Sequence, residues 1–298
     1  MRNPPFWNSP RVLLICAVLF WSGNFVVGRA ISDSVPPIAL AFWRWAGGSL
    51  LALLLAVPHL RRDWPVLKRH WPILLLLSAF GISAFNTMIY IGLGTTTAVN
   101  ALLMQSAMPM LIMASAFLLF GERVGIRQIT GLAVSLVGVA VIATRGAPSE
   151  LLRLSLNPGD AWIMGAVLAY ALYSTLLRKR PAVHPLTFLC TTFALGAAML
   201  LPFYLWEHAQ GARFIASAAS LTALSYVIVF PGMLAYLFYN RGVELLGSAK
   251  AGLFIHLMPV FGSLLAVVFL NEQIHLFHAA GIALIGTGIA LATARKPA

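Results

Sequence analysis

Apolar residues along this chain come in long runs that are separated by short polar segments. A helix that crosses the hydrocarbon core of a bilayer needs about 20 predominantly apolar residues. By that measure the pattern predicts ten membrane-spanning helices joined by short loops. The predicted spans are residues 12–31, 37–57, 71–93, 97–120, 126–144, 159–177, 186–206, 218–239, 248–270 and 276–294.

One stretch of the pattern occurs twice. Residues 98–145 recur in diverged form as residues 248–295, without a gap between the two copies. Pro109 and Pro259 lie 150 residues apart, and so do Glu122 and Glu272. The glycine pairs 131/281 and 138/288 keep the same offset of 150. The repeat predicts two homologous five-helix halves, residues 1–146 and 157–298.

Composition agrees with a chain whose surroundings are mostly lipid. Of its 298 residues, 60% are hydrophobic and only 9% are charged, whereas soluble domains average about 25% charged residues. The net charge of +12 comes from basic residues in short loops, so no nucleic acid partner is expected. The loops leave no room for a soluble domain, and no cofactor or metal is expected.

The basic residues also predict how the chain lies in the membrane, because cytoplasmic loops are enriched in Lys and Arg. With a cytoplasmic N-terminus, 15 of the 20 Lys and Arg residues fall in cytoplasmic segments and four fall outside, while Arg44 lies within a span. Both termini are therefore predicted to be cytoplasmic. Five spans per half is an odd number, so the second half must insert upside down. Inverted repeats of this kind place a substrate site near the bilayer midplane.

Motifs in both halves resemble a known family. Each half has an apolar run with a central proline that ends in Gly121–Glu122 or Asn271–Glu272, followed by a glycine-spaced helix. The first span adds the segment FWSGNF, residues 20–25. The chain thus resembles the EamA family of the drug/metabolite transporter superfamily, and within it the amino-acid exporters of the YddG type. The resemblance implies ten helices around a central cavity and export of small metabolites across the bacterial inner membrane.

Pro109 and Pro259 lie at matched positions inside two predicted spans. A proline within a helix removes one backbone donor and frees the carbonyl four residues earlier, here those of Gln105 and Ile255. Pro109 and Pro259 are therefore predicted either to be tolerated kinks or to be hinges for alternating access. Matching positions in both copies favour hinges.

Few ionisable residues fall within the spans. We expect Arg44 to reach the outer surface by snorkelling or to form a structural bridge, with a substrate carboxylate as the alternative partner. His256 is either a neutral, hydrogen-bonded group or a group that binds substrate or a proton. Glu122 and Glu272 each precede a predicted helix, where a carboxylate suits the helix N-terminus. No Asp or Glu lies mid-span, which argues against proton antiport and favours facilitated diffusion.

Aromatic, amide and thioether side chains recur at helical spacing within the spans. Such groups suit a cavity wall that accepts varied apolar side chains and the polar ends of a small molecule. Ordinary helix packing is the alternative for each of them taken singly. The predicted substrate-binding residues are Trp21, Asn24, Asn86, Tyr90, Met104, Gln105, Met108, Tyr170, Tyr173, Tyr236, Tyr239 and His256.

These observations predict an all-α membrane transporter that exports amino acids, aromatic and other neutral ones included, by facilitated diffusion. A monomer would suffice, because one chain contains both halves. The alternatives are another metabolite class and a proton-coupled antiporter. A transporter of phosphorylated metabolites is expected to have paired Lys or Arg residues facing the cavity, and Arg44 is the only candidate for such a residue here. An intramembrane enzyme is the remote alternative, since no H-E-x-x-H or G-x-S-x-G motif occurs.

Overall fold

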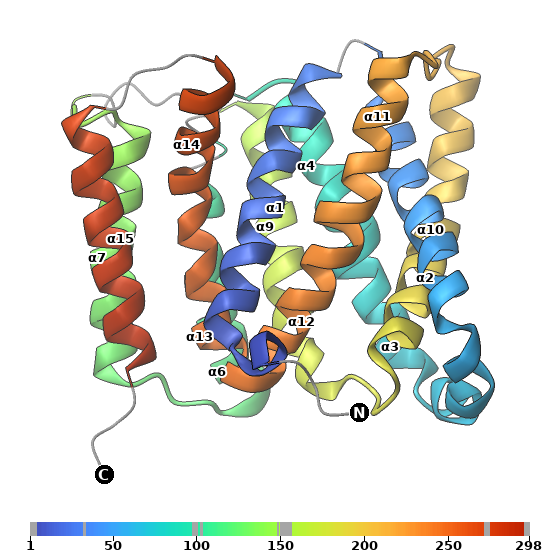
Figure 1. Ribbon diagram of the computed structural model, residues 1–298, viewed down its shortest axis with the longest axis horizontal. Coiled ribbons are helices and arrows are strands. Elements are labelled where there is room, and N and C mark those ends of the chain that lie inside the picture. Colours follow the sequence, from blue (N-terminus) through green and yellow to red (C-terminus); the bar gives the residue numbers. More distant parts are fainter. Residues whose placement is uncertain are drawn as a thin grey trace.

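The fold of the computed structural model is a bundle of helices that run between two ends (Figure 1). The structure describes residues 5–31, 34–96, 101, 104–147, 149, 157–270 and 275–294. Within these residues every regular element is helical. The first half contains α1 (Pro10–Ala30), α2 (Pro37–Arg69), α3 (Trp71–Ser78), α4 (Phe85–Leu93), α6 (Met108–Phe120) and α7 (Ile126–Ala143). The second half contains α9 (Pro158–Leu176), α10 (Pro185–Ala209), α11 (Ala218–Val227), α12 (Ala235–Leu246), α13 (Ser248–Gly252), α14 (Met258–Leu270) and α15 (Leu276–Thr293).

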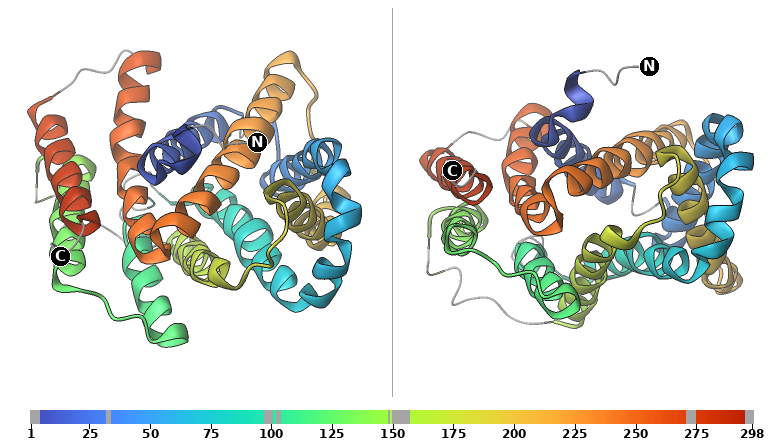
Figure 2. Two further views of the ribbon diagram at one scale, coloured as in Figure 1. Left: turned by 60° about the horizontal axis from the view of Figure 1, so that its bottom comes forward. Right: turned by 90° about the horizontal axis from the view of Figure 1, so that it is seen from below.

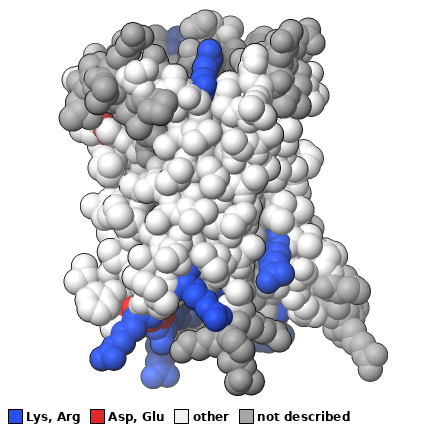
Figure 3. All heavy atoms as spheres, turned by 90° about the vertical axis from the view of Figure 1, so that its left-hand side faces the viewer, with Lys and Arg blue, Asp and Glu red and all other residues white. Residues whose placement is uncertain are grey.

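The described helices are those of a multi-pass membrane protein. Eight helical segments are long and apolar enough to cross a bilayer, and two shorter apolar helices, Pro10–Asn24 and Met108–Phe120, accompany them. Large apolar side chains such as Leu118 and Val268 face outward, 78% and 69% exposed. In Figure 3 an uncharged belt separates the two ends, and the blue basic side chains gather mainly at the lower one. The predicted all-α membrane fold is confirmed at this level.

Helix α2 differs most from its predicted length. The apolar run ends at residue 57, but the helix continues through two prolines to Arg69. At about 1.5 Å per residue, its 33 residues span roughly 50 Å, which exceeds the hydrocarbon core. Hydropathy marks where a span leaves the lipid, and a helix need not end there. The last turns of α2 therefore extend beyond the membrane.

Helices α2 and α10 are antiparallel neighbours, and each supplies an acidic side chain to the start of the other. The Glu207 carboxylate on α10 accepts hydrogen bonds from the backbone N–H groups of Ile38 (3.0 Å) and Ala39 (2.7 Å). In return, Asp63 on α2 accepts from the backbone N–H of His184, 2.9 Å away. Helix N-termini expose unpaired donors and carry partial positive charge, so both carboxylates stabilise the pair.

Helices α7 and α15 lie side by side at one edge of the molecule, the green and red helices of Figures 1 and 2. Glycines allow this close approach. A Cβ atom at Gly131 would lie 2.5 Å from the Gly288 carbonyl oxygen, and one at Gly138 would lie 2.8 Å from that of Gly281. Small residues let membrane helices meet backbone to backbone. The regularly spaced glycines seen in the sequence therefore form the surface through which α7 and α15 pack.

Pro109 and Pro259 each lie in the first turn of an α-helix and not in its middle. Pro109 lies in the first turn of α6, after a turn at residues 106–107. Pro259 lies in the first turn of α14, after the 3₁₀ segment η5 (Leu253–Leu257). Proline is favoured in a first helical turn, where its missing N–H has no helical partner. The regular α-helical pattern is thus interrupted at both matched positions, by a turn before Pro109 and by a 3₁₀ segment before Pro259.

A second pair of irregular segments was not predicted. The π-helical segment η2 (Ala79–Ala84) joins α3 to α4, and η4 (Ile228–Leu234) joins α11 to α12. Gly81 and Pro231, in the middle of these segments, lie 150 residues apart. π-Helical turns are rare and widen the helix, which redirects backbone carbonyls from their usual partners.

Candidate functional site

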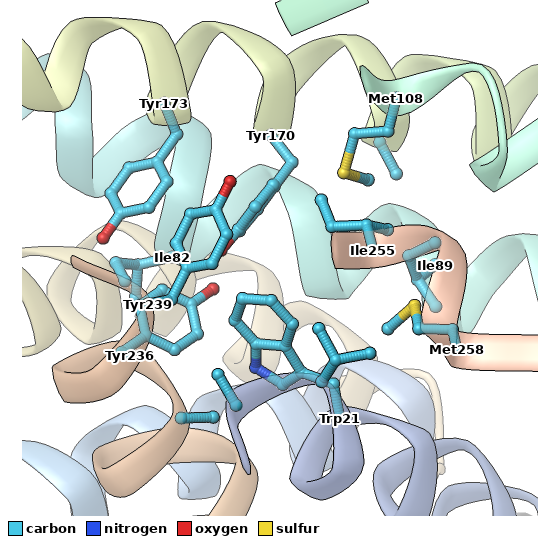
Figure 4. Packing of buried hydrophobic residues seen from close by; sticks show 14 of the residues in the cluster. Trp21, Ile82, Ile89, Met108, Tyr170, Tyr173, Tyr236, Tyr239, Ile255 and Met258 are labelled. Carbon is cyan, nitrogen blue, oxygen red and sulfur yellow. The ribbon is translucent and has the colours of Figure 1, made fainter. Parts of the chain in front are cut away.

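Five of the predicted residues form one aromatic cluster in the centre of the molecule (Figure 4). Trp21 from α1 lies within 5.1–5.9 Å, between ring centroids, of the rings of Tyr170, Tyr236 and Tyr239. Tyr173 extends the cluster, 5.3 Å from Tyr170 and 5.9 Å from Tyr236. All five side chains are buried. The cluster therefore joins α1 of the first half to α9 and α12 of the second.

Helical spacing explains how these rings meet. Tyr170 and Tyr173 are three residues apart on α9, and Tyr236 and Tyr239 are three apart on α12, so each pair shares one helix face. Two of the hydroxyl groups on these helices have polar partners on the opposite helix. Tyr173 donates to Asn240 Oδ1 at 2.8 Å, and Tyr239 lies 2.7 Å from the Ser174 hydroxyl. Buried tyrosine hydroxyls usually have such partners, but the Tyr170 hydroxyl has none among the described residues.

Three other predicted residues surround Arg44. Its Nη1 atom lies 3.0 Å from Asn24 Oδ1, 3.1 Å from Asn86 Oδ1 and 3.0 Å from Tyr90 Oη. Tyr90 in turn donates to Asn24 Oδ1 at 3.1 Å. Arg44 is only 1% exposed, so it does not snorkel to the surface; of the two structural expectations, the hydrogen bonds agree with the structural bridge. Its depth along α2 was predicted, but the helix turns its side chain inward, where it bridges α1, α2 and α4.

The partners of the Arg44 guanidinium are all neutral oxygens. Within the described residues no carboxylate lies in salt-bridge contact with it; the described ion pairs involve other arginines. Burying a charge costs on the order of several kcal/mol, and each charge-assisted hydrogen bond returns roughly 1.5–3 kcal/mol. Arg44 also lies 4.7 Å from the centre of the Trp45 ring, a favourable cation–π contact. The site is therefore electropositive and polar on the side of the first half.

The carbonyl groups of the two π-helical segments receive hydrogen bonds at this site. The Pro231 carbonyl accepts from Arg44 Nη2 at 2.9 Å and from Trp21 Nε1 at 3.1 Å. The Gly81 carbonyl accepts from the Tyr236 hydroxyl at 2.5 Å. Sequence reasoning missed both backbone groups. The signal present was a glycine and a proline at matched positions of two apolar runs.

His256 lies in η5 and is 1% exposed. Both ring nitrogens have partners: Nδ1 lies 2.6 Å from the Ser135 hydroxyl, and Nε2 lies 2.9 Å from the Ser106 carbonyl oxygen. Ser106 is the residue 150 positions before His256. His256 therefore connects the two interrupted helices to α7, as expected for a neutral, hydrogen-bonded histidine.

The remaining predicted residues belong to the first interrupted helix. Met108 is buried, and Figure 4 shows it together with Met258 on the far side of Trp21 from Tyr173. Met104 is half-buried. Gln105 is buried, and its Oε1 atom has no hydrogen-bond partner among the described residues. The structure thus brings the predicted residues into one central region with three parts: aromatic, arginine-centred and methionine-lined.

Glu122 does not cap the following helix as expected. The N-cap of α7 is Gly125, whose backbone N–H donates to the Gln128 side chain at 3.0 Å. The Glu122 carboxylate instead pairs with Arg178 at the end of α9. Glu122 lies three residues before the N-cap, and its carboxylate reaches a neighbouring helix. Glu272, the matching residue, lies outside the described residues.

Sequence comparison identifies the family. The sequence profile of the EamA-like transporter family matches residues 9–144 and again residues 157–294. The chain belongs to this family. The EamA-like match covers almost all of both halves, which indicates that the chain is a membrane transporter.

Individual relatives agree with this assignment. The chain is 24% identical over 285 residues to the uncharacterized transporter YyaM of Bacillus subtilis, covering 95% of this chain and 92% of YyaM. It is 26% identical to the uncharacterized transporter YetK of the same organism, covering 96% and 87%. One chain of known crystal structure superposes with a TM-score of 0.78 at 21% identity, covering 96% of both chains. That likeness shows that the EamA-like chain shares its fold.

Proposed function

We propose that this EamA-like transporter exports amino acids, aromatic and other neutral ones included, by facilitated diffusion through alternating access. The observation that carries the proposal is the central site. There an aromatic cluster around Trp21 and Tyr170 adjoins a guanidinium and amides at Arg44, Asn24 and Asn86. Aromatic rings suit an apolar side chain, and the polar groups suit the charged ends of an amino acid.

We further propose that residues 1–146 and 157–298 are inverted repeats. Three symmetric contacts support this arrangement: the glycine contacts of α7 and α15, the exchanged carboxylates of α2 and α10, and the central Asn–Tyr pairs. Tyr90 donates to Asn24, and Tyr173 donates to Asn240; Tyr90 and Asn240 lie 150 residues apart with the residue types exchanged. The proposed ten helices would then surround one site near the midplane.

Charge supports the proposed orientation. The basic residues gather at one end of the molecule (Figure 3), which is also the end where α1 begins and α15 ends (Figure 1). Cytoplasmic loops carry the excess of Lys and Arg. Both termini are therefore proposed to be cytoplasmic, with the protein in the bacterial inner membrane. A monomer suffices, since one chain supplies every residue of the site.

The proposed movement uses the interrupted helices. Pro109 and Pro259 begin α6 and α14 directly beside the site, and a helix break offers backbone freedom that a continuous helix lacks. We assign hinge roles to both prolines. Met104, Gln105, Met108 and His256, around the two breaks, then change their surroundings as the halves move.

We propose that transport is not coupled to protons, because of where the acidic side chains lie. The described Asp and Glu residues lie toward helix ends, as with Asp160 in the first turn of α9 and Glu207 near the end of α10. Proton-coupled transporters use a carboxylate within the membrane that alternates between proton and substrate. Substrate movement would then follow its own concentration gradient.

Purified protein in liposomes tests the substrate proposal. We expect labelled phenylalanine and other neutral amino acids to enter the vesicles, where they are recovered chemically unchanged. Protein-free vesicles give the background rate. Flux of none of the amino acids would refute the proposal, and recovery of an altered compound would favour an enzyme.

A further inference from the structure

The Arg44 guanidinium has donors for which the described residues supply no acceptor. Its Nη1 atom lies within 3.1 Å of three acceptor oxygens although it carries two N–H groups. Its Nη2 atom contacts one acceptor, the Pro231 carbonyl. Among the described residues its buried Nε atom has no hydrogen-bond partner. Nε–H and one Nη2–H form one edge of the planar guanidinium, the fork that binds a carboxylate with two parallel hydrogen bonds.

The neighbouring Asn86 side-chain amide also has a donor without a hydrogen-bond partner among the described residues. Asn86 is 3% exposed and gives its Oδ1 atom to Arg44, but its Nδ2 atom has no partner among the described residues. Buried polar groups are normally satisfied, and an unpartnered donor requires an explanation.

The fold itself does not require an arginine at this position. Pro37 and Pro185, which begin α2 and α10, lie 148 residues apart, and the same offset relates Arg44 to Thr192. Thr192 is 1% exposed, and its hydroxyl hydrogen-bonds to carbonyls of its own helix, at 2.9 Å for Phe188. The equivalent helix of the second half therefore packs at this depth without a charge. The positive charge is a property of the site in one half only.

We propose that Arg44, assisted by Asn86 Nδ2, is the subsite that binds the carboxylate of the transported molecule. The inference rests on the transport function proposed above and narrows its substrate class to compounds that carry a free carboxylate. The edge formed by Nε and Nη2 receives the carboxylate, and the adjacent aromatic cluster receives the side chain. Compounds in which that carboxylate is amidated or missing are then poor ligands.

The carboxylate subsite can be tested without measuring transport. The measurement is the rise in melting temperature of the detergent-solubilised protein when a ligand is added. The probes are L-phenylalanine, 3-phenylpropionate, L-phenylalaninamide and phenethylamine. We expect the two acids to stabilise the wild type, and the amide and the amine to bind about tenfold more weakly or worse, as expected for loss of a bidentate charge-assisted pair. Equal binding of acids, amide and amine, or binding of none of the four, would overturn the inference.

Asn86→Asp is the decisive variant, because it places a carboxylate against Arg44 without changing the side-chain shape. We expect it to fold and to lose acid binding by about tenfold or more, since the internal carboxylate competes for the guanidinium. Asn8→Asp is the matched control, because Asn8 Oδ1 also accepts from an arginine, Arg241 Nη2 at 3.2 Å, at an exposed position. Unchanged acid binding in Asn86→Asp would overturn the inference.

A second variant covers the case in which Asn86→Asp does not fold. Arg44→Lys keeps the charge but removes the planar fork, and we expect it to lose the preference for acids over amides. The two proposals fail differently. If 3-phenylpropionate binds in an Arg44-dependent way but no amino acid binds or moves, the carboxylate subsite stands and the amino-acid function is wrong. If amino acids move and Arg44→Lys keeps the acid preference, the subsite is wrong.

Discussion

Gly81 and Pro231 lie at matched positions of the two halves, and the carbonyl oxygen of each accepts a hydrogen bond from a side chain of the other half. Tyr236 donates to Gly81, while Arg44 and Trp21 donate to Pro231. Both carbonyls belong to π-helical turns. These contacts connect the halves at the site itself, so their loss is expected to affect both stability and transport.

Removing the Tyr236 hydroxyl tests this connection. Tyr236→Phe keeps the ring contacts but leaves the Gly81 carbonyl without that donor. We expect the free energy of unfolding to fall by about 0.5–2 kcal/mol, the range for hydrogen bonds between membrane helices. The measurement is thermal denaturation in detergent. Tyr204→Phe is the control, because Tyr204 stacks on Phe42 near the end of α10; an equal loss in both variants would contradict the assigned role.

The glycine surface between α7 and α15 gives a second prediction. A Cβ atom at Gly288 would lie 2.5 Å from the Gly131 carbonyl oxygen, whereas one at Gly286 on the same helix meets nothing within 4 Å. We therefore expect Gly288→Ala to destabilise the protein by roughly 1–3 kcal/mol through overpacking. Gly286→Ala should be neutral or slightly stabilising, because alanine is the better helix former. Similar melting temperatures for the two variants would argue against this packing.

His184, in the loop before α10, gives the third prediction. Its Nδ1 atom accepts a hydrogen bond from the Leu186 N–H at 3.3 Å, its ring stacks 3.7 Å from that of His59, and its backbone N–H contacts Asp63. Burial lowers the pKa of His184, and His59 and Arg62 lower this pKa further against the opposing charge of Asp63.

The sign of the pH effect follows from that lowered pKa. The folded state favours neutral His184, so its contribution to stability is present above the unfolded pKa of about 6.5 and is lost as the pH falls below it. We expect the melting temperature to fall between about pH 7 and pH 5. His184→Asn keeps a side-chain cap that does not titrate, and the fall should become smaller. An unchanged pH profile in this variant would exclude His184 as the cause.

The proline positions give the fourth prediction. Pro109→Ala and Pro259→Ala restore a backbone donor beside the helix breaks and favour continuous helix. We expect the transport rate to fall several-fold while the melting temperature stays the same or rises. Pro202→Ala, inside α10 on an exposed face, is the matched control and should transport normally. A wild-type rate in both hinge variants would remove the hinge role.

The membrane segments were predictable because apolar runs are set by the lipid itself. The residues of the centre were also predictable in part, since Trp21, Tyr170 and Tyr236 combine apolar surroundings with a polar group. The direction of the Arg44 side chain was not predictable, because hydropathy gives its depth along α2 but not the rotation of that helix about its axis. The π-helical turns were missed because hydrophobic periodicity assumes one helix type, and a glycine and a proline at matched positions do not by themselves specify a π-helical turn.

We propose that this chain moves amino acids down their own concentration gradient. The most direct test measures uptake of labelled phenylalanine into proteoliposomes, with and without an imposed proton gradient. We predict saturable uptake that stops at equal inside and outside concentrations, is accelerated by unlabelled phenylalanine inside, and is unaffected by the proton gradient. Accumulation above the outside concentration when protons flow, or no protein-dependent uptake at all, would contradict the account.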